Sequence, residues 1–136
     1  MSLLSIENLK THFFTKAGLV KSVDGVSFEL DRGEILGIVG ESGSGKSVTG
    51  FSIMGLVDPP GRVVEGSIRF DGQDLVGMAE PIMRDLRGRR IAMIFQDPMM
   101  TLNPVLRVDT QMIEALRAHG PWSDEDARQR CRDVLG

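Results

Sequence analysis

Apolar and polar residues alternate in two segments near the start of the chain. Residues 3–9 place Leu4, Ile6 and Leu9 at apolar positions, and residues 20–30 repeat the pattern. In a strand, successive side chains point to opposite faces of the sheet, so a period of two indicates one buried and one solvated face. Both segments are therefore predicted to be half-buried strands, the second ending in a tight turn.

Two other short runs are almost continuously apolar: residues 34–39 (EILGIV) and 90–95 (RIAMIF). Their length and content predict strands buried on both faces. The chain between them is compatible with a helix over residues 46–56. The Asp-Gly pair at 71–72 then favours a hairpin between two short strands, 67–70 and 73–75.

The last third of the chain has helical patterns. Residues 81–87 predict one or two helical turns, and residues 109–119 and 124–135 predict two longer helices. Ser123, with Asp126 three residues later, predicts a capping box at the start of the last helix. A single cysteine, Cys131, falls within that helix, where it is expected to be a small apolar residue.

A glycine-rich segment lies between the first apolar run and the helix that follows it. It reads GESGSGKS and fits G-x-x-x-x-G-K-[ST] at every fixed position. Its residues are Gly40, Glu41, Ser42, Gly43, Ser44, Gly45, Lys46 and Ser47. A flexible Gly/Ser linker would have the same composition, but the apolar run before it and the helix after it favour a phosphate-binding loop.

Each fixed position of this motif has a chemical reason. Glycines let the backbone wrap an anion so that successive N–H groups point inward, and the N-terminus of the next helix adds positive potential. Lys46 is predicted to bridge the β- and γ-phosphates of ATP. Ser47 is predicted to offer its hydroxyl to Mg²⁺, which prefers hard oxygen ligands.

A second motif follows Lys46 at a distance of 50 residues. The segment 94–98 reads IFQDP, with Gln96 at its centre, and resembles the Q-loop of ATP-binding cassette (ABC) ATPases. Four stretches resemble the oligopeptide, dipeptide and nickel branch of ABC importers: GIVGESGSGKSVT, SIMGL, GSIRFDGQDL and RIAMIFQDPMMTLNPV. The resemblance spans nearly the whole chain and is weakest after about Val108.

The resemblance implies a fold and a domain organisation. The fold is α/β, a P-loop NTPase core of the ABC ATPase type with an N-terminal antiparallel β subdomain and the start of a helical subdomain. Residues 1–136 would be the N-terminal part of one ABC ATPase domain. Residues 1–108 would form the nucleotide-binding core, and residues 109–136 would begin the helical subdomain.

The resemblance also implies roles for single residues. Gln96 would contact Mg²⁺ or the attacking water and, with Lys46, would serve catalysis; Val48 would extend the nucleotide-binding segment. An aromatic residue before the loop would stack on adenine, and Phe14 is our choice, with Phe13 as the alternative. A surface for a membrane subunit is expected, or ordinary loop packing instead, at three residues after the Q-loop: Met99, Met100 and Leu102.

ABC ATPases need motifs that these 136 residues do not contain. The sequence lacks an LSGGQ-type signature, a second apolar strand ending in Asp-Glu and a switch histidine; His12 and His119 are expected at the surface instead. Glu41 is a poor candidate for the general base, because its side chain should point away from the phosphates. We therefore expect this stretch to bind nucleotide weakly without turning it over.

The leading hypothesis is the ATPase subunit of an importer for peptides or a related solute. Its partners would be transmembrane permease subunits and a second ATPase subunit, of the same or a different chain. The alternatives are a non-transport ABC protein and a non-catalytic nucleotide-binding or regulatory module. Neither the solute, nor a downstream iron–sulfur segment, nor the type of dimer can be read from this sequence.

Charge and composition narrow these hypotheses. The net charge is -3, which argues against a nucleic-acid partner, and the 41% hydrophobic content fits a folded chain. No apolar run reaches the roughly 18 residues that a spanning helix requires. No secretory signal is visible and one cysteine cannot form an internal disulfide, so we expect a peripheral protein at the cytoplasmic face of the inner membrane.

Overall fold

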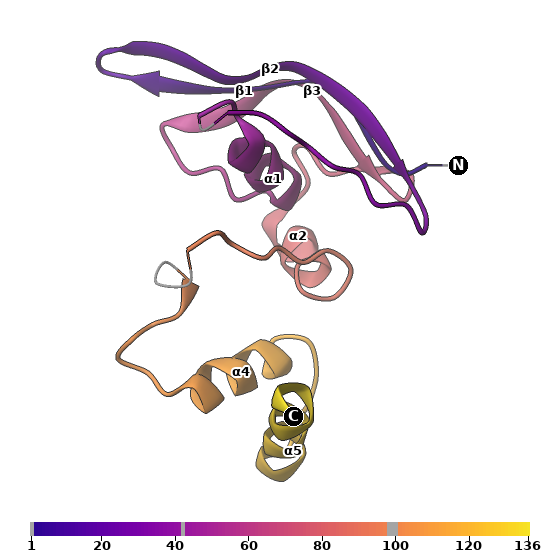
Figure 1. Cartoon of the computed structure of the whole chain (residues 1–136), viewed down its shortest axis with the longest axis vertical. Coiled ribbons are helices and arrows are strands. Elements are labelled where there is room, and N and C mark those ends of the chain that lie inside the picture. The colour runs from indigo at the N-terminus through magenta and orange to yellow at the C-terminus, as the bar shows by residue number, and fades with distance from the viewer. Residues whose placement is uncertain (1, 42, 98–100) are drawn as a thin grey trace. The chain divides into compact units, whose positions relative to one another are not determined.

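The computed structural model describes residues 2–41, 43–97 and 101–136. The chain divides into two compact units, Met1–Arg84 and Asp85–Gly136. The first unit contains an antiparallel sheet and one helix, and the second contains two longer helices (Figure 1). The boundary between the units falls inside a short helix, α2 (Glu80–Leu86), which confirms the helical turns predicted there.

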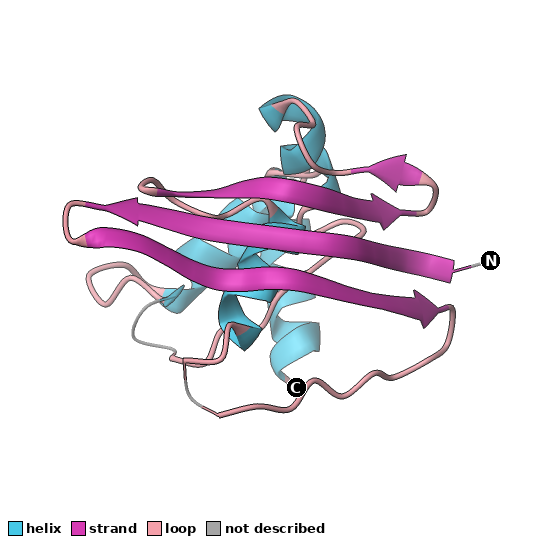
Figure 2. Ribbon diagram, turned by 90° about the horizontal axis from the view of Figure 1, so that it is seen from above, coloured by secondary structure: helices cyan, strands magenta, loops and turns pink. Residues whose placement is uncertain are grey.

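The sheet has four antiparallel strands in the order β2-β1-β3-β4 (Figure 2). The strands are β1 (Ser2–Thr15), β2 (Gly18–Asp31), β3 (Gly61–Phe70) and β4 (Gln73–Asp74). The two strands predicted at the start of the chain are confirmed, and both are longer than the alternating pattern suggested. The Asp-Gly hairpin is also confirmed, because it joins β3 to β4.

The core of the first unit lies on one face of this sheet. Ile6 stands opposite Phe28 on one neighbouring strand and Ile68 on the other. Its buried apolar side chains are Ile6, Leu9, Val23, Met54, Ile68, Phe70, Leu75 and Met83. Burial of such side chains contributes about 1.5–3 kcal/mol each, so this cluster is the main source of stability in the unit.

One helix, α1 (Lys46–Met54), contacts β1 and β2. The hydroxyl groups of Thr11 on β1 and Ser52 on α1 form a buried hydrogen bond of 2.7 Å. Because both groups are removed from water, this bond satisfies them and fixes the helix on the sheet. The helix predicted over residues 46–56 is thus confirmed, but Gly55 ends it in a left-handed conformation before the Pro-Pro-Gly segment.

The prediction of a strand over residues 34–39 is wrong. This segment has no regular secondary structure, and Ile35 and Val39 are 97% and 94% exposed. A strand buried on both faces needs neighbouring strands for its N–H and C=O groups. Within residues 2–41, 43–97 and 101–136, no strand pairs with it. The apolar pattern predicted a buried environment that these residues do not supply.

The second predicted buried strand, residues 90–95, is also wrong. Ile91 forms only an isolated bridge to Arg87, and its carbonyl accepts a hydrogen bond from the Gly88 amide at 2.8 Å. Ile94 is 99% exposed. Residues 88–91 therefore form a local turn in place of a hydrogen-bonded strand ladder. The reason is the same as for residues 34–39, because the described part of the chain has no strand that pairs with this segment.

The second unit is built from α4 (Val108–Arg117) and α5 (Asp124–Leu135), as predicted. Its core consists of Ile113, Ala127 and Cys131, with Met112, Leu116 and Trp122 packed against them. The sequence predicts Cys131 as a small apolar residue within the last helix, and it lies buried in α5. No helix among the described residues is both long and apolar enough to cross a membrane.

Asp109 links the two helices at the surface of this unit. Its carboxylate accepts hydrogen bonds from Arg128 of α5 at 3.1 Å and from the Thr110 amide at 2.7 Å, and it pairs with Arg107 at 3.1 Å. Partial desolvation acts to raise the pKa of Asp109, but these three groups together hold that pKa below its ordinary value. The link is therefore complete above the ordinary pKa and weakens as pH falls through the lowered one.

The capping prediction at α5 is confirmed, and it gives a test of this unit. The Ser123 hydroxyl accepts a hydrogen bond from the Asp126 amide at 3.1 Å. Ser123→Ala should lower the free energy of unfolding by about 1 kcal/mol, because one helix-end amide loses its partner. Urea denaturation followed by the fluorescence of the single tryptophan, Trp122, measures this loss. Gln129→Ala, on the exposed side of α5, is the control, and an equal loss there would contradict the capping account.

Candidate functional site

The candidate site begins where residues 34–39 end. Gly40, Glu41, Gly43 and Ser44 are exposed, and the Ser44 amide donates to the Glu41 carbonyl at 3.0 Å. Gly45 is partly buried, and Lys46 begins α1 directly after it. Ser42 lies outside the described residues. The hydrogen bond between Ser44 and Glu41 forms a turn, and the segment leads directly into the N-terminus of α1. The motif predicted this loop followed by a helix.

The Lys46 ammonium lies within this loop. It donates hydrogen bonds to the carbonyls of Gly40 at 2.5 Å and Glu41 at 2.8 Å, and to the Ser44 hydroxyl at 3.2 Å. The loop carbonyls therefore hold the positive charge of Lys46, which the motif predicts to be the phosphate-binding group. The structure therefore brings together the lysine and the glycine-rich backbone that the sequence pattern required.

Glycine is required at two positions of the loop for different reasons. A Cβ on Gly45 would lie 2.2 Å from the backbone carbonyl oxygen of Ser22 on β2, and Gly45 has φ +95°. A Cβ on Gly40 would lie 2.5 Å from the Ser44 hydroxyl oxygen. At both positions the absence of a Cβ lets another part of the protein approach the loop backbone closely, and at Gly45 that part is the main chain of β2.

The N-terminus of α1 is open to a ligand. Gly45 is its N-cap and carries no capping side chain, and no acidic residue occupies the first turn. Both the amide and the hydroxyl of Thr49 donate to the Gly45 carbonyl, at 2.9 and 2.8 Å. Unpaired N–H groups and the helix dipole at such an end favour an anion. The residues present fit a triphosphate.

Ser47 and Val48 occupy the first turn of α1. Ser47 is exposed, and the Val48 carbonyl accepts a hydrogen bond from the Ser52 hydroxyl at 2.7 Å. No group of three or more His, Cys, Asp or Glu side chains gathers in the described parts of the chain. Magnesium in nucleotide sites is commonly held by few protein oxygens together with the phosphates, so the Ser47 hydroxyl is a fitting ligand.

The two candidates for the adenine-stacking residue lie in different surroundings. The Phe13 ring packs over Gly61, where an added Cβ would come within 2.4 Å of it. Phe14 is 46% exposed, and the Arg62 guanidinium carbon lies 4.8 Å from the centroid of its ring. Phe14 therefore has the accessible ring, in agreement with our choice between the two, and its contact with adenine remains a prediction.

Gln96 lies in the second unit, exposed, in the irregular segment that follows Ile91. Its approach to the phosphates and to Mg²⁺ remains a prediction, because Lys46 belongs to the first unit. Of the three residues expected to contact a membrane subunit, Met99 and Met100 lie outside the described residues. Leu102 is exposed, as that role requires.

The segment after Leu102 is tied to α4 by one side chain. The Gln111 amide group donates to the carbonyls of Asn103 at 3.0 Å and Leu106 at 3.1 Å, and its oxygen accepts from the Asn103 amide at 2.9 Å. These bonds hold the Asn-Pro turn against the helix. Leu102 and Val105 are nevertheless exposed on it, so a firmly held loop presents apolar side chains to solvent.

Comparison with known proteins decides the family. The sequence profile described as "ABC transporter" matches residues 23–135, which is most of the chain. The chain belongs to the ABC transporter family. It is 46% identical to the dipeptide transport ATP-binding protein DppD of Escherichia coli (strain K12), over 99% of this chain and 41% of that protein. It is 48% identical to the oligopeptide transport ATP-binding protein OppD of Bacillus subtilis (strain 168), over 98% of this chain and 37% of that protein.

Solved structures of ABC cassettes share the fold. A dimeric bacterial ABC transporter cassette, MJ0796, superposes with a TM-score of 0.83 at 23% identity, over 97% of this chain and 55% of that one. A second structure of MJ0796, bound to ADP and Pi, has a TM-score of 0.79. The predicted fold class is therefore confirmed. The chain spans about two fifths of the curated ABC relatives and about half of these cassettes.

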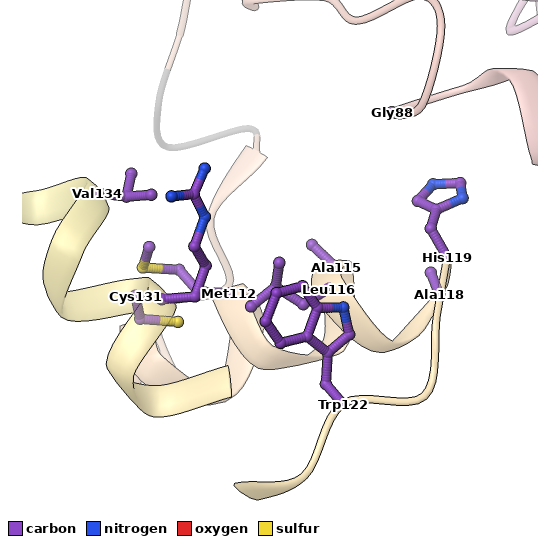
Figure 3. Close-up of a pocket in the computed structure, with 10 residues that line it drawn as sticks. Gly88, Met112, Ala115, Leu116, Ala118, His119, Trp122, Cys131 and Val134 are labelled. Atoms are coloured by element: carbon purple, nitrogen blue, oxygen red, sulfur yellow. The ribbon is translucent and has the colours of Figure 1, made fainter. Parts of the chain in front are cut away.

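In the second unit, a hollow of about 610 Å³ lies between α4 and α5 (Figure 3). Its lining is mainly apolar, with Met112, Leu116 and Trp122 beside Cys131. His119 also lines it, and its Nδ1 is buried with no hydrogen-bond partner among the residues that the structure describes. The expectation that His119 and His12 are surface residues is wrong, since both are partly buried.

Sequence reasoning missed two features of the candidate nucleotide site. One is the close approach of Gly45 to Ser22, and the other is the position of Arg62 over Phe14. Both join residues that are far apart in the chain. The only sequence signal for the first was the glycine itself, and the second had none, because it depends on the pairing of β1 with β3.

Proposed function

We propose that this chain binds Mg-ATP at residues 40–48 and forms part of the energy-coupling ATPase subunit of an ABC importer for peptides or a related solute. The observation that supports this most is the Lys46 ammonium inside a glycine-rich loop that ends at an uncapped helix N-terminus. The names of the relatives at 46–48% identity, a dipeptide and an oligopeptide transport protein, support the importer role.

In this proposal each residue of the site has a defined role. The Lys46 ammonium leaves the Gly40 and Glu41 carbonyls and pairs with the β- and γ-phosphates, while the loop amides and the α1 N-terminus hold the remaining oxygens. Magnesium supplies charge neutralisation at the phosphates when it is bound, and Ser47 and Gln96 are its candidate protein ligands. Gln96 orients the attacking water and links the nucleotide to the membrane-facing loop.

The domain assignment is part of the same proposal. Residues 1–108 form the nucleotide-binding core, and residues 109–136 begin the helical subdomain of one ABC ATPase domain. The assembled subunit works at the cytoplasmic face of the inner membrane, with transmembrane permease subunits and a second ATPase subunit. The dimeric cassette among the fold relatives and the exposed Leu102 and Val105 support these partners.

Reconstitution tests the importer role. The full-length protein and its membrane partners are placed in liposomes with a labelled dipeptide on the substrate side and ATP on the ATPase side. Peptide uptake that requires ATP and stops in a Gln96→Ala complex is the expected result. ATP turnover without uptake of any peptide tested would contradict a peptide importer while leaving nucleotide binding intact.

A second expectation concerns turnover by residues 1–136 alone. Hydrolysis needs a group that orients the attacking water and a carboxylate near the metal, and Lys46, Ser47 and Gln96 do not supply a general base. We expect phosphate release by this stretch to equal that of its Lys46→Ala variant, whereas the full-length protein hydrolyses ATP. Turnover that survives purification of the short form and disappears with Lys46→Ala would show that it carries its own base.

A further inference from the structure

The aromatic pair of β1 is held in two different ways by the start of β3. Gly61 is buried, and the absence of a Cβ there leaves room for the Phe13 ring, which therefore packs into the sheet. The Phe14 amide donates to the Pro60 carbonyl at 3.0 Å, which ties its backbone to the same end of β3. As a result the Phe13 ring packs against Gly61, whereas Phe14 is exposed at the surface.

The next residue of β3, Arg62, covers the Phe14 ring. Its guanidinium carbon is 4.8 Å from the ring centroid, within the range of about 6 Å for a cation–π contact. Phe14 and Arg62 are both exposed. They lie on the neighbouring strands β1 and β3, in which Phe13 pairs with Gly61 and His12 pairs with Arg62. The contact therefore joins two strands of one sheet in the same unit as the phosphate loop.

We propose that Arg62 is a positioning residue for nucleotide binding, which holds the Phe14 ring in the orientation that stacks on adenine. This inference rests on the proposed function. A ring has two faces, and a guanidinium on one of them restricts the side chain to few rotamers while leaving the other face to the base. The cation also draws ring electron density toward itself, which suits stacking of an electron-rich base on the opposite face.

The inference predicts an effect on ATP that depends on both the base and Phe14. Arg62→Ala should weaken Mg-ATP binding by about two- to fivefold, the size expected when one exposed cation–π contact is lost. Binding of Mg-tripolyphosphate, which has no base, should not change. In a Phe14→Ala background, Arg62→Ala should have no further effect, because Arg62 acts only through that ring.

Equilibrium dissociation constants of the full-length protein for Mg-ATP and Mg-tripolyphosphate test this. The variants are Arg62→Ala, Phe14→Ala and the double variant. Arg69→Ala is the matched control, since Arg69 is an exposed arginine on the same strand. The expected result is a loss for ATP alone in Arg62→Ala and no change in Arg69→Ala.

Each other outcome overturns the inference in a recognisable way. Unchanged or tighter ATP binding in Arg62→Ala would show that the guanidinium does not support the ring or that it covers the face that the base needs. An equal loss for tripolyphosphate would indicate a general charge effect, and a loss that persists without Phe14 would indicate direct contact with the nucleotide. Failure of the proposed function itself would appear separately, as a wild-type protein that binds neither ligand.

Discussion

Lys46→Ala is expected to weaken Mg-ATP binding by about ten- to a hundredfold. The substitution removes charge-assisted hydrogen bonds to the phosphates that are worth about 1.5–3 kcal/mol in total. The ammonium already lies within hydrogen-bond distance of the Gly40 and Glu41 carbonyls, so it needs no large movement to meet a phosphate held by the same loop. The loss should appear in affinity, since the loop carbonyls are exposed and can bond to water instead.

Isothermal titration of the full-length protein with Mg-ATP measures this change, and thermal unfolding without nucleotide checks that the fold is kept. Lys21→Ala is the matched control, because Lys21 is an exposed lysine of β2 outside the loop. A distant surface charge is screened by salt, so this control should stay within about twofold of the wild type. Unchanged affinity in Lys46→Ala would remove Lys46 from the site and with it the proposed function.

Local features of the fold could be predicted from the sequence because their causes are local. The strands β1 and β2 follow from the alternating residues within each of them, and the cap of α5 follows from Ser123 itself. The phosphate loop is also local, since its residues are consecutive and its helix begins at Lys46. In each case the residues that set the structure lie within a few positions of it.

The two apolar runs could not be predicted in the same way. Residues 34–39 and 90–95 have the composition of buried strands, yet Ile35 and Ile94 are almost fully exposed. A strand exists only beside another strand that takes its hydrogen bonds, and the identity of that partner is not written in the run itself. The hydrophobic pattern therefore indicated that these segments need neighbouring strands and a buried environment, which the described residues do not supply.

Contacts between segments that are distant in the chain could not be predicted from the sequence either. Arg62 reaches Phe14 only because β3 pairs with β1, and Gly45 meets Ser22 only because α1 packs on β2. Both contacts involve the candidate nucleotide site. The motif thus predicts which residues bind phosphate, while the structure shows which contacts hold those residues in place.

The second large effect is expected from Gly45→Ala. The new Cβ would lie 2.2 Å from the Ser22 carbonyl oxygen, a backbone atom of β2, and the alanine would have to keep φ at +95°. The loop must therefore move away from β2, which disturbs the Gly45 carbonyl that accepts both Thr49 hydrogen bonds. We expect a loss of about 1–3 kcal/mol in the free energy of unfolding and Mg-ATP affinity at least about tenfold weaker.

Gly43→Ala separates the two causes of this effect. Gly43 lies in the same loop with φ +83°, but a Cβ there meets nothing within 4 Å. It therefore carries the backbone strain without the collision, and urea denaturation and Mg-ATP titration should show a clearly smaller loss than in Gly45→Ala. Equal losses in the two variants would mean that strain alone is responsible and that contact with Ser22 does not position the loop. A larger loss in Gly45→Ala would show that β2 fixes where the phosphate-binding backbone lies.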